Sequence, residues 1–490
     1  MSLFETIGER VREKVKNWLR LNSAPQQSFS INEYTTHETE IIRSKLWYRG
    51  DANELFQFFH QLNKLRVVQG SFWGSVPENS SVRKVHSGIP AIIADTLAYI
   101  VKSDMDGIEA PDEWDDISDS INFAKVVGQA VVDTLVEGDG AFRISVDGDK
   151  ISLDFIGASR CEYEDDDVII YTQYPSKHRI YTLKERYGKG FVESRLYDDN
   201  GHEVPLSTVP ELTETQPYIV FDGDYSLAVP LMFYVSKKYP GRGKSIFTGG
   251  KSDCFDSLDE VISQWWDAVR AGRVKQYIPE SMIPRNPTDG SMLMPDQFGN
   301  NYIAVDAPIA EGVNNQEIKV VQPEIKYEAF VSAYTNALLM CLQGLVSPAT
   351  LGIDVGKMSS AEAQREKKDV TGNTRNTITS ALEKVLPELI NAVLMTYDNI
   401  RHTAPQKREI TVSFGEYGAP DFDSRVETVG KAATYGIMSI DTQVDELWGG
   451  SKDDEFKAAE VQRIKYEKGI LTMSEPSVGD GVLDVPIEGA

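Results

Sequence analysis

Helical periodicity is broken at Gly344-Leu345-Val346-Ser347-Pro348-Ala349-Thr350-Leu351-Gly352-Ile353-Asp354-Val355-Gly356, which contains three Gly and one Pro and predicts a turn. Beyond this turn, apolar residues recur at steps of four and three on one helical face, namely Ile378, Leu382, Val385, Leu389, Val393 and Tyr397. The pattern predicts a polar helix of more than about forty residues, which would span roughly 60 Å. A helix of that length favours a subunit of an assembly over a compact enzyme.

Two further helices are predicted upstream of the turn. Residues 256–271 and 327–342 have helical apolar spacing, and the interval between them, 279–323, is interrupted by proline. We therefore expect a pair of helices that brackets a compact, β-rich insertion.

The first half of the chain predicts a mixed α+β domain. Helical spacing covers Glu40–Asn63, Ile89–Lys102 and Ile121–Leu135. Short alternating segments with turn residues between them then predict an antiparallel meander, with strands at Ala141–Val146, Lys150–Phe155, Val168–Tyr174, Arg179–Leu183 and Gly190–Tyr197. The acidic runs at 104–119 and 162–167 are typical of solvated loops or faces.

Both ends of the chain have their own patterns. Residues 1–21 form a basic amphipathic helical pattern, which favours an arm docked on a neighbouring surface over a membrane-surface helix. At the other end, N-cap residues Ser439 and Ser451 predict three short helices over 421–435, 440–448 and 452–468, followed by a tail without periodicity.

Three motifs carry a resemblance to a known family. They are Leu345–Asp354 with Ser359-Ser360-Ala361-Glu362-Ala363, Lys431–Ser439 with Thr442–Leu447, and Gly138-Asp139-Gly140-Ala141-Phe142. In their order, which covers roughly residues 35 to 470, they resemble the portal proteins of long-tailed (siphovirus-type) bacteriophages.

The resemblance implies the portal fold: an α/β wing, a two-helix stem, a small β-rich clip, a long wing helix and a helical crown. Its expected divisions are an N-terminal arm at 1–35, wing at 36–235, first stem helix at 236–273, clip at 274–324, second stem helix at 325–343, tunnel loop at 344–358, long helix with return to the wing at 359–420, and crown with tail at 421–490.

The resemblance also implies function and partners. Portal proteins form a homo-oligomeric ring, twelve-membered in the family, at one capsid vertex of the virion, through which double-stranded DNA is packaged and ejected. The implied partners are the terminase packaging motor, a head-tail adaptor, and the major capsid and scaffolding proteins. The residues expected to face DNA are Ser347, Thr350, Asp354, Lys357 and Ser359. Those expected to bind the motor or adaptor are Met282, Arg285, Met292, Met294 and Phe298.

Composition agrees with an assembly subunit made in the cytoplasm. A length of 490 residues predicts two or more folding units. Three Cys without CxxC spacing argue against a disulfide framework and a Cys zinc site. No long apolar run or signal peptide is evident, so we expect a soluble intracellular protein without a membrane partner. The net charge of −25 suits either DNA that slides without adhering or simple solubility.

No catalytic motif is complete. Gly241-Arg242-Gly243-Lys244-Ser245 and Gly249-Gly250-Lys251-Ser252 lack the first Gly of a phosphate loop, and the six His are scattered without zinc-protease spacing. We therefore expect no enzymatic activity, no cofactor and no metal. The alternatives that remain open are an NTP-driven DNA-packaging enzyme and an oligomeric phage scaffold or adaptor that does not contact DNA.

Overall fold

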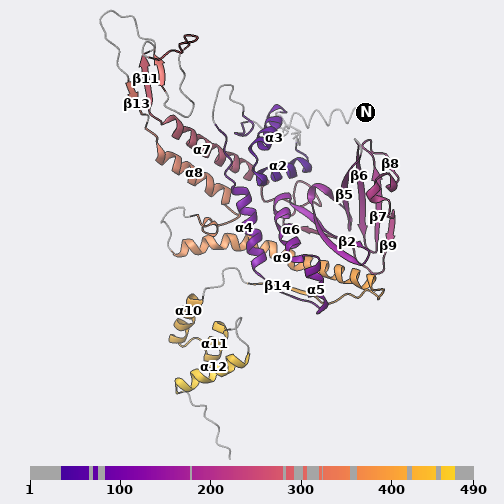
Figure 1. Ribbon diagram of the computed structural model, residues 1–490. Helices are drawn as coiled ribbons and strands as arrows, with labels where there is room; N and C mark the ends of the chain where they lie inside the picture. The colour runs from indigo at the N-terminus through magenta and orange to yellow at the C-terminus, as the bar shows by residue number, and fades with distance from the viewer. Residues whose placement is uncertain are drawn as a thin grey trace, which may run out of the picture. The chain divides into compact units, whose positions relative to one another are not determined.

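The computed structural model describes residues 35–65, 70–75, 83–176, 179–279, 283–291, 302–305, 319–322, 324–353, 361–415, 422–448 and 454–469. The chain separates into two compact units, residues 1–415 and residues 416–490. The predicted arm helix at 1–21, the N-cap at Ser451 and the tail at 473–490 lie outside the described residues. Figure 1 traces the elements in chain order.

The described part of the first unit begins with two helices, α2 (His37–Arg49) and α3 (Ala52–Lys64). Asp51 starts α3, because its carboxylate accepts hydrogen bonds from two amides of the first turn. Gly50, between the helices, has a left-handed φ of 69°. The single helical stretch predicted for Glu40–Asn63 is therefore wrong, since the backbone reverses its handedness at Gly50 and the helix must end there.

The acidic run at 104–119 contains regular structure. It spans strand β1 (Met105–Glu109) and helix α5 (Glu113–Ser120), which lie between helices α4 (Ile89–Ser103) and α6 (Phe123–Glu137). Trp114 and Ile117 of α5 are buried, whereas the acidic side chains of the helix are exposed. Of the two expectations for this run, the solvated face is correct and the solvated loop is wrong. Two apolar residues three positions apart are enough to pack one side of a short helix on the core.

The strands of the first unit form an α+β arrangement with separate sheets. A three-stranded sheet has the order β10-β2-β3, and a larger sheet has the order β4-β5-β6-β7-β8 with β9 on β7. The strands are β2 (Asp139–Asp147), β3 (Lys150–Gly157), β4 (Cys161–Glu164), β5 (Asp167–Ser176), β6 (Arg179–Gly188), β7 (Phe191–Tyr197), β8 (Glu203–Val204), β9 (Tyr218–Val220) and β10 (Ala228–Met232). All of these pairings are antiparallel. The five predicted strands therefore exist, but they belong to two sheets rather than one meander.

A pair of antiparallel helices leads away from this body (Figure 1). They are α7 (Lys251–Ala271) and α8 (Tyr327–Leu342). Beyond them, β11 (Lys275–Pro279) pairs in parallel with β12 (Tyr302–Val305) and antiparallel with β13 (Lys319–Val321). The segments that enter and leave this sheet lie close together where they join the helices. A Cβ built on Gly272 would lie only 2.5 Å from Ile325 Cδ1. The predicted helix pair with a β-rich insertion is confirmed as secondary structure.

The predicted long helix is α9 (Ala361–Ile400), of 40 residues. Its apolar face is confirmed, because Ile378, Leu382, Leu389 and Val393 are all fully buried. They belong to one large core shared with α4, α6, α7 and β2. Arg375 binds Asp104 (Nε to Oδ2, 3.0 Å) and the Gly415 carbonyl, and so fixes α9 beside the ends of β1 and β14 (Thr411–Phe414).

The described residues of the second unit form three helices, α10 (Phe422–Thr434), α11 (Ile440–Trp448) and α12 (Asp454–Glu467). Ser439 caps α11 as predicted, because its hydroxyl accepts from the Thr442 amide at 3.2 Å. Trp448 of α11 and Phe456 of α12 meet edge to face, with ring centroids 5.9 Å apart. The three predicted C-terminal helices are therefore present.

Candidate functional site

The helix pair α7–α8 is held together by aromatic side chains. Trp265 of α7 stacks on Phe330 of α8 with the ring planes 6° apart, and it also contacts Tyr334. Elsewhere on the two helices, large apolar side chains face solvent: Trp266 is 59% exposed, Tyr327 61% and Met340 56%. Several exposed side chains of this size on one helix pair give it the character of a contact surface.

The first half of α7 is joined to the body by two carboxylates, Asp259, which is buried, and Asp256, which is half-buried. Asp259 is fully buried and accepts hydrogen bonds from Trp73 Nε1 at 3.0 Å and the Ser87 amide at 2.8 Å. His86 Nδ1 lies 2.7 Å from the same carboxylate. Buried carboxylates are tolerated only when donors satisfy them, so these contacts set the position of α7 against the body.

One turn earlier, Asp256 accepts from the amides of Phe72 and Trp73 at 2.6 and 3.0 Å. Burial raises the pKa of Asp256, and the two amide hydrogen bonds oppose that rise. The two carboxylates together tie α7 to Phe72 and Trp73 and to His86 and Ser87.

The base of α8 is held by Lys251 from the first turn of α7. Its ammonium group donates to the carbonyls of Met340 at 2.8 Å, Cys341 at 3.1 Å and Gln343 at 2.6 Å. Carbonyls at the end of a helix have no partner within it, and a cation there also opposes the negative end of the helix dipole. Lys251 therefore fixes the start of the turn that begins at Gly344.

The structure places two of the five predicted DNA-facing residues. Ser347 is buried, with 2% of its surface exposed, and its amide donates to the Thr371 hydroxyl at 2.8 Å. Thr350 is half-buried, and its hydroxyl lies 3.0 Å from the same Thr371 oxygen. The prediction that Ser347 faces a channel is therefore wrong, because α9 covers it. Asp354, Lys357 and Ser359 lie outside the described residues.

Of the predicted motor-binding residues, only Arg285 is described. It is exposed, and its neighbour Ile283 is 5% exposed and contributes apolar surface to the interior. Met282, Met292, Met294 and Phe298 lie outside the described residues, so the sequence prediction for them stands as a prediction.

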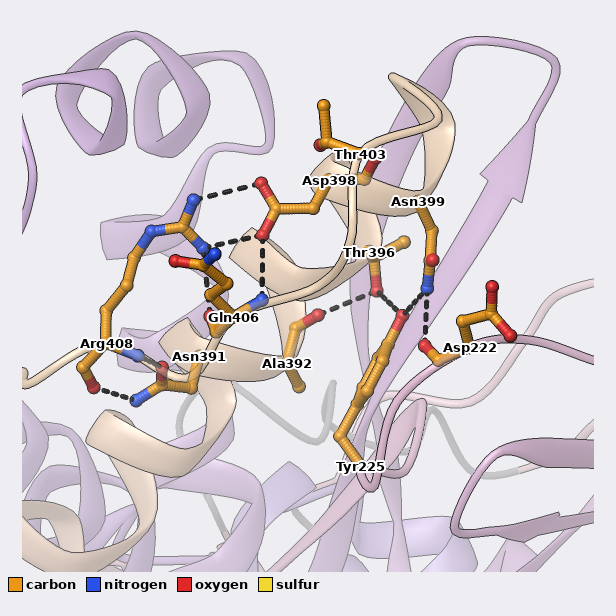
Figure 2. Close-up of polar contacts among 10 residues, drawn as sticks. All are labelled: Asp222, Tyr225, Asn391, Ala392, Thr396, Asp398, Asn399, Thr403, Gln406 and Arg408. Atoms are coloured by element: carbon orange, nitrogen blue, oxygen red, sulfur yellow. Dashed lines mark hydrogen bonds and ion pairs between the residues drawn. The ribbon is translucent and has the colours of Figure 1, made fainter.

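A second network holds the far end of α9 (Figure 2). Arg408 binds Asp398 through two hydrogen bonds of 2.9 Å. Burial raises the pKa of Asp398, but the hydrogen bonds from Arg408 and the Gln406 amide outweigh burial and leave this pKa below its ordinary value. The buried Tyr225 hydroxyl accepts from Asn399 at 2.9 Å. These bonds join α9 to Tyr225, which precedes it in the sequence, and to Arg408, which follows it.

The segment that resembles a phosphate loop uses its amides internally. Arg242 makes a two-pronged ion pair with the fully buried Asp139. Four backbone amides have partners: Gly243 with Asp139 Oδ2, Lys244 with the Tyr234 carbonyl, Ile246 with the Leu135 carbonyl, and Phe247 with Ser245 Oγ. These are the donors that a phosphate group would require, and they are occupied.

Sequence reasoning missed Asp259, His86 and Lys251. A lone His, an Asp in an acidic chain and a Lys after two glycines carry no local signal of burial. Trp47 and Trp73 are fully buried in the core.

The helices in the described ranges include none with the length and apolar character of a membrane span. Among the described residues there is also no cluster of three or more His, Cys, Asp or Glu placed to hold a metal ion.

No protein-family model and no curated protein matches the chain. Among solved structures, the chain is similar to a chain from the virion of a native gene transfer agent particle, with 11% identity, 91% of this chain and 97% of that chain covered, and a TM-score of 0.36. It is also similar to a chain from the neck of an empty gene transfer agent particle, with 13% identity, 78% and 96% covered, and a TM-score of 0.33.

Proposed function

We propose that the chain is a portal protein: the subunit of a ring at one capsid vertex, through which double-stranded DNA enters and leaves. The support is the order of its elements. An α/β body is followed by two antiparallel helices around a three-stranded sheet, a short turn, a 40-residue helix and a separate three-helix unit. This is the order that the sequence resemblance implies. In it, a helix pair with a surface for lateral contacts is connected to a long helix that packs in the core.

The observation that carries the proposal is the uncovered apolar face of α7. Trp266 and Val269 lie three residues apart on α7, beyond Asp259, the buried carboxylate that the body holds. Ile262, between Asp259 and Trp266, still packs partly against the core. Trp266 is 59% exposed and Val269 43%. Burial of such a face is worth about 25 cal/mol per Å² of apolar surface, and a ring covers every copy of it with one repeated heterologous contact.

The remaining parts of the proposal rest on the sequence resemblance. In the proposed ring, the predicted DNA-facing residues that remain are Asp354, Lys357 and Ser359, and the packaging motor and later the head-tail adaptor attach at the sheet β12-β11-β13, at the outer end of the helix pair. Capsid and scaffolding proteins surround the body at the vertex of the virion. A channel through an acidic chain lets DNA slide, because repulsion keeps it from adhering.

The alternative of an NTP-driven packaging enzyme is weaker, because the amides of Gly243, Lys244, Ile246 and Phe247 are already bound within the chain. A portal does not hydrolyse ATP itself.

Negative-stain electron microscopy of the purified full chain, with its mass measured by light scattering, tests the proposal. Rings with a central channel are expected, together with no ATP turnover by the same preparation. A monomer at every concentration would overturn the portal assignment, and a linear filament would favour a scaffold instead. ATP turnover that co-purifies with the chain would favour the packaging enzyme.

A further inference from the structure

A long stretch of this acidic chain lacks acidic residues. Between Tyr225 and Ser252 there is no Asp or Glu, although the whole chain contains 75 of them. The same stretch contains five cations, namely Lys237, Lys238, Arg242, Lys244 and Lys251. It forms one wall of a cavity of about 410 Å³, whose other wall comes from α2 and the end of α6.

Three of the five cations are already paired. Lys251 binds the end of α8, Arg242 binds Asp139, and Lys238 binds Glu40 at 2.9 Å and Thr35. The two others, Lys237 and Lys244, are exposed and line the cavity. Within the described residues, neither ammonium group has a hydrogen bond or ion pair.

The remaining acidic groups of the cavity do not serve these two lysines. Glu137 is bound to Lys45 at 2.8 Å and to the Ser159 amide, and Glu40 is bound to Lys238. The cavity therefore presents two uncompensated positive charges to an anionic partner.

A matching acidic ridge lies on α5 of the same chain. Asp112, Asp115, Asp116 and Asp119 are spaced i, i+3, i+4 and i+7, so they share one face, opposite the buried Trp114 and Ile117. All four are exposed, and no ion pair involves them in the part of the chain that the structure describes. Like charges at this spacing destabilise a helix, and a cationic partner would offset that cost.

We infer that the α5 ridge of one copy of this chain docks at the Lys237 and Lys244 cavity of the next copy. This inference rests on the proposed ring, and it names one lateral contact within it. The contact is heterologous, with different surfaces on the two sides, which is what a closed ring requires. Within one copy, α5 is fixed by Trp114, which packs edge to face on Phe123 with centroids 5.0 Å apart.

Other anions fit less well. Residues 1–21 contain five basic and three acidic residues, so the N-terminal arm does not complement two lysines. A DNA duplex is too wide for a recess of about 410 Å³, which admits a few side chains. A small phosphate compound would seek backbone amides, and four of those beside Lys244 (Gly243, Lys244, Ile246 and Phe247) are bound within the chain.

The first test is a charge reversal with its rescue. The double variant Lys237→Glu/Lys244→Glu should raise the protomer concentration for half assembly about tenfold at about 0.1 M salt, with a smaller effect at about 1 M. Asp115→Lys/Asp116→Lys should do the same, and the four substitutions combined should restore assembly. The matched control Lys150→Glu/Lys189→Glu makes the same change in net charge at exposed positions outside the cavity and should have no effect.

The second test detects the contact directly. Full-length Lys244→Cys and Asp116→Cys chains, mixed and mildly oxidised with diamide, should form a disulfide-linked dimer that neither variant forms alone. The single variants also report any bond to the native Cys residues.

Rings without this cross-link, and without any effect of the charge reversals, would overturn the inference and leave the portal proposal standing. Absence of rings from the wild-type chain would instead overturn the portal proposal. Inorganic phosphate that binds the wild-type chain but not Lys237→Glu/Lys244→Glu, with no cross-link formed between copies, would identify a small-anion site. That result would likewise overturn the inference.

Discussion

The ammonium group of Lys251 lies 2.6 Å from the carbonyl oxygen of Gln343, so the first turn of α7 supplies a donor that the last turn of α8 lacks. Lys251→Met keeps most of the side-chain volume and removes all three donors. It should lower the free energy of unfolding by about 1–3 kcal/mol, because carbonyls at the helix end lose their partner. Urea denaturation followed by circular dichroism measures this. Lys150→Met, at an exposed position, is the control. Equal effects of both variants would show that Lys251 is not a structural donor.

Gly50 is the next sensitive position. A Cβ there would lie 2.5 Å from the His86 ring, which is held by Asp259 and contacts Trp47 and Trp73, and φ at this residue is positive. Gly50→Ala should destabilise the fold by about 2–4 kcal/mol, as the sum of backbone strain and displacement of the ring.

Gly88→Ala provides the matched control for Gly50→Ala. Its φ is 72°, and nothing lies within 4 Å of the added Cβ. Strain alone should cost about 1–2 kcal/mol there. The interpretation fails if the two variants have the same melting temperature.

Asp133 should make stability depend on pH. Burial, together with the nearby Glu137 carboxylate, raises the pKa of Asp133 to about 6. The folded state then holds a proton that the unfolded state releases near pH 4, so stability is lost as the pH rises from about 4 through 6. Asp133→Asn should stabilise the protein at about pH 8 by about 1–2 kcal/mol, after allowance for partial exposure, and should be neutral near pH 4.

Thermal denaturation across this pH range measures the effect of Asp133→Asn. The variant Asp147→Asn, at the exposed end of β2, controls for the loss of one charge. A constant difference between Asp133→Asn and wild type at every pH would rule out the proton linkage.

The Tyr225 hydroxyl should stabilise the end of α9. It accepts from Asn399, lies 3.3 Å from the Thr396 hydroxyl, and belongs to a side chain that is 8% exposed. Tyr225→Phe should cost about 1–2 kcal/mol, because buried groups lose a partner. Tyr218→Phe, at a residue 55% exposed, should be nearly neutral in the same denaturation experiment. A neutral Tyr225→Phe would show that the network in Figure 2 adds no net stability.

Trp266 tests the contact surface of α7 without disturbing the core. Trp266→Ser should leave the free energy of unfolding of the monomer within about 0.5 kcal/mol of wild type, because the indole is already solvated. Assembly should weaken at least about tenfold, since an indole buried between copies contributes strongly. Sedimentation velocity compares it with Tyr99→Ser, at a residue 73% exposed on α4. Unchanged assembly of Trp266→Ser would place the ring contact elsewhere.

Periodicity in the sequence predicted most elements, because it records which side of an element is buried. The face of α9 from Ile378 to Val393 and the helix pair at 256–271 and 327–342 were found in this way. Register and partner choice depend on contacts distant in sequence and leave no such record. The split of the meander into two sheets and the parallel pairing of β11 with β12 were therefore missed.

The candidate site was harder to predict for the same reason. Lys251, Asp259 and His86 act through partners that are scores of positions away, so no local spacing marks them. Ser347 was misjudged because a Gly- and Pro-rich turn suggests exposure, whereas this one lies under α9.

The close approach of Gly272 to Ile325 has a consequence for the evolution of the chain. Because the insertion between these residues leaves and returns at one point, it can be exchanged or remodelled without moving α7 or α8. The sequence of the body must preserve one packed core through all such changes, whereas the sequence of the small sheet can change with its binding partner. Sequence divergence should therefore be fastest between residues 273 and 324, and chimeras cut at this junction should fold with an insertion taken from another protein.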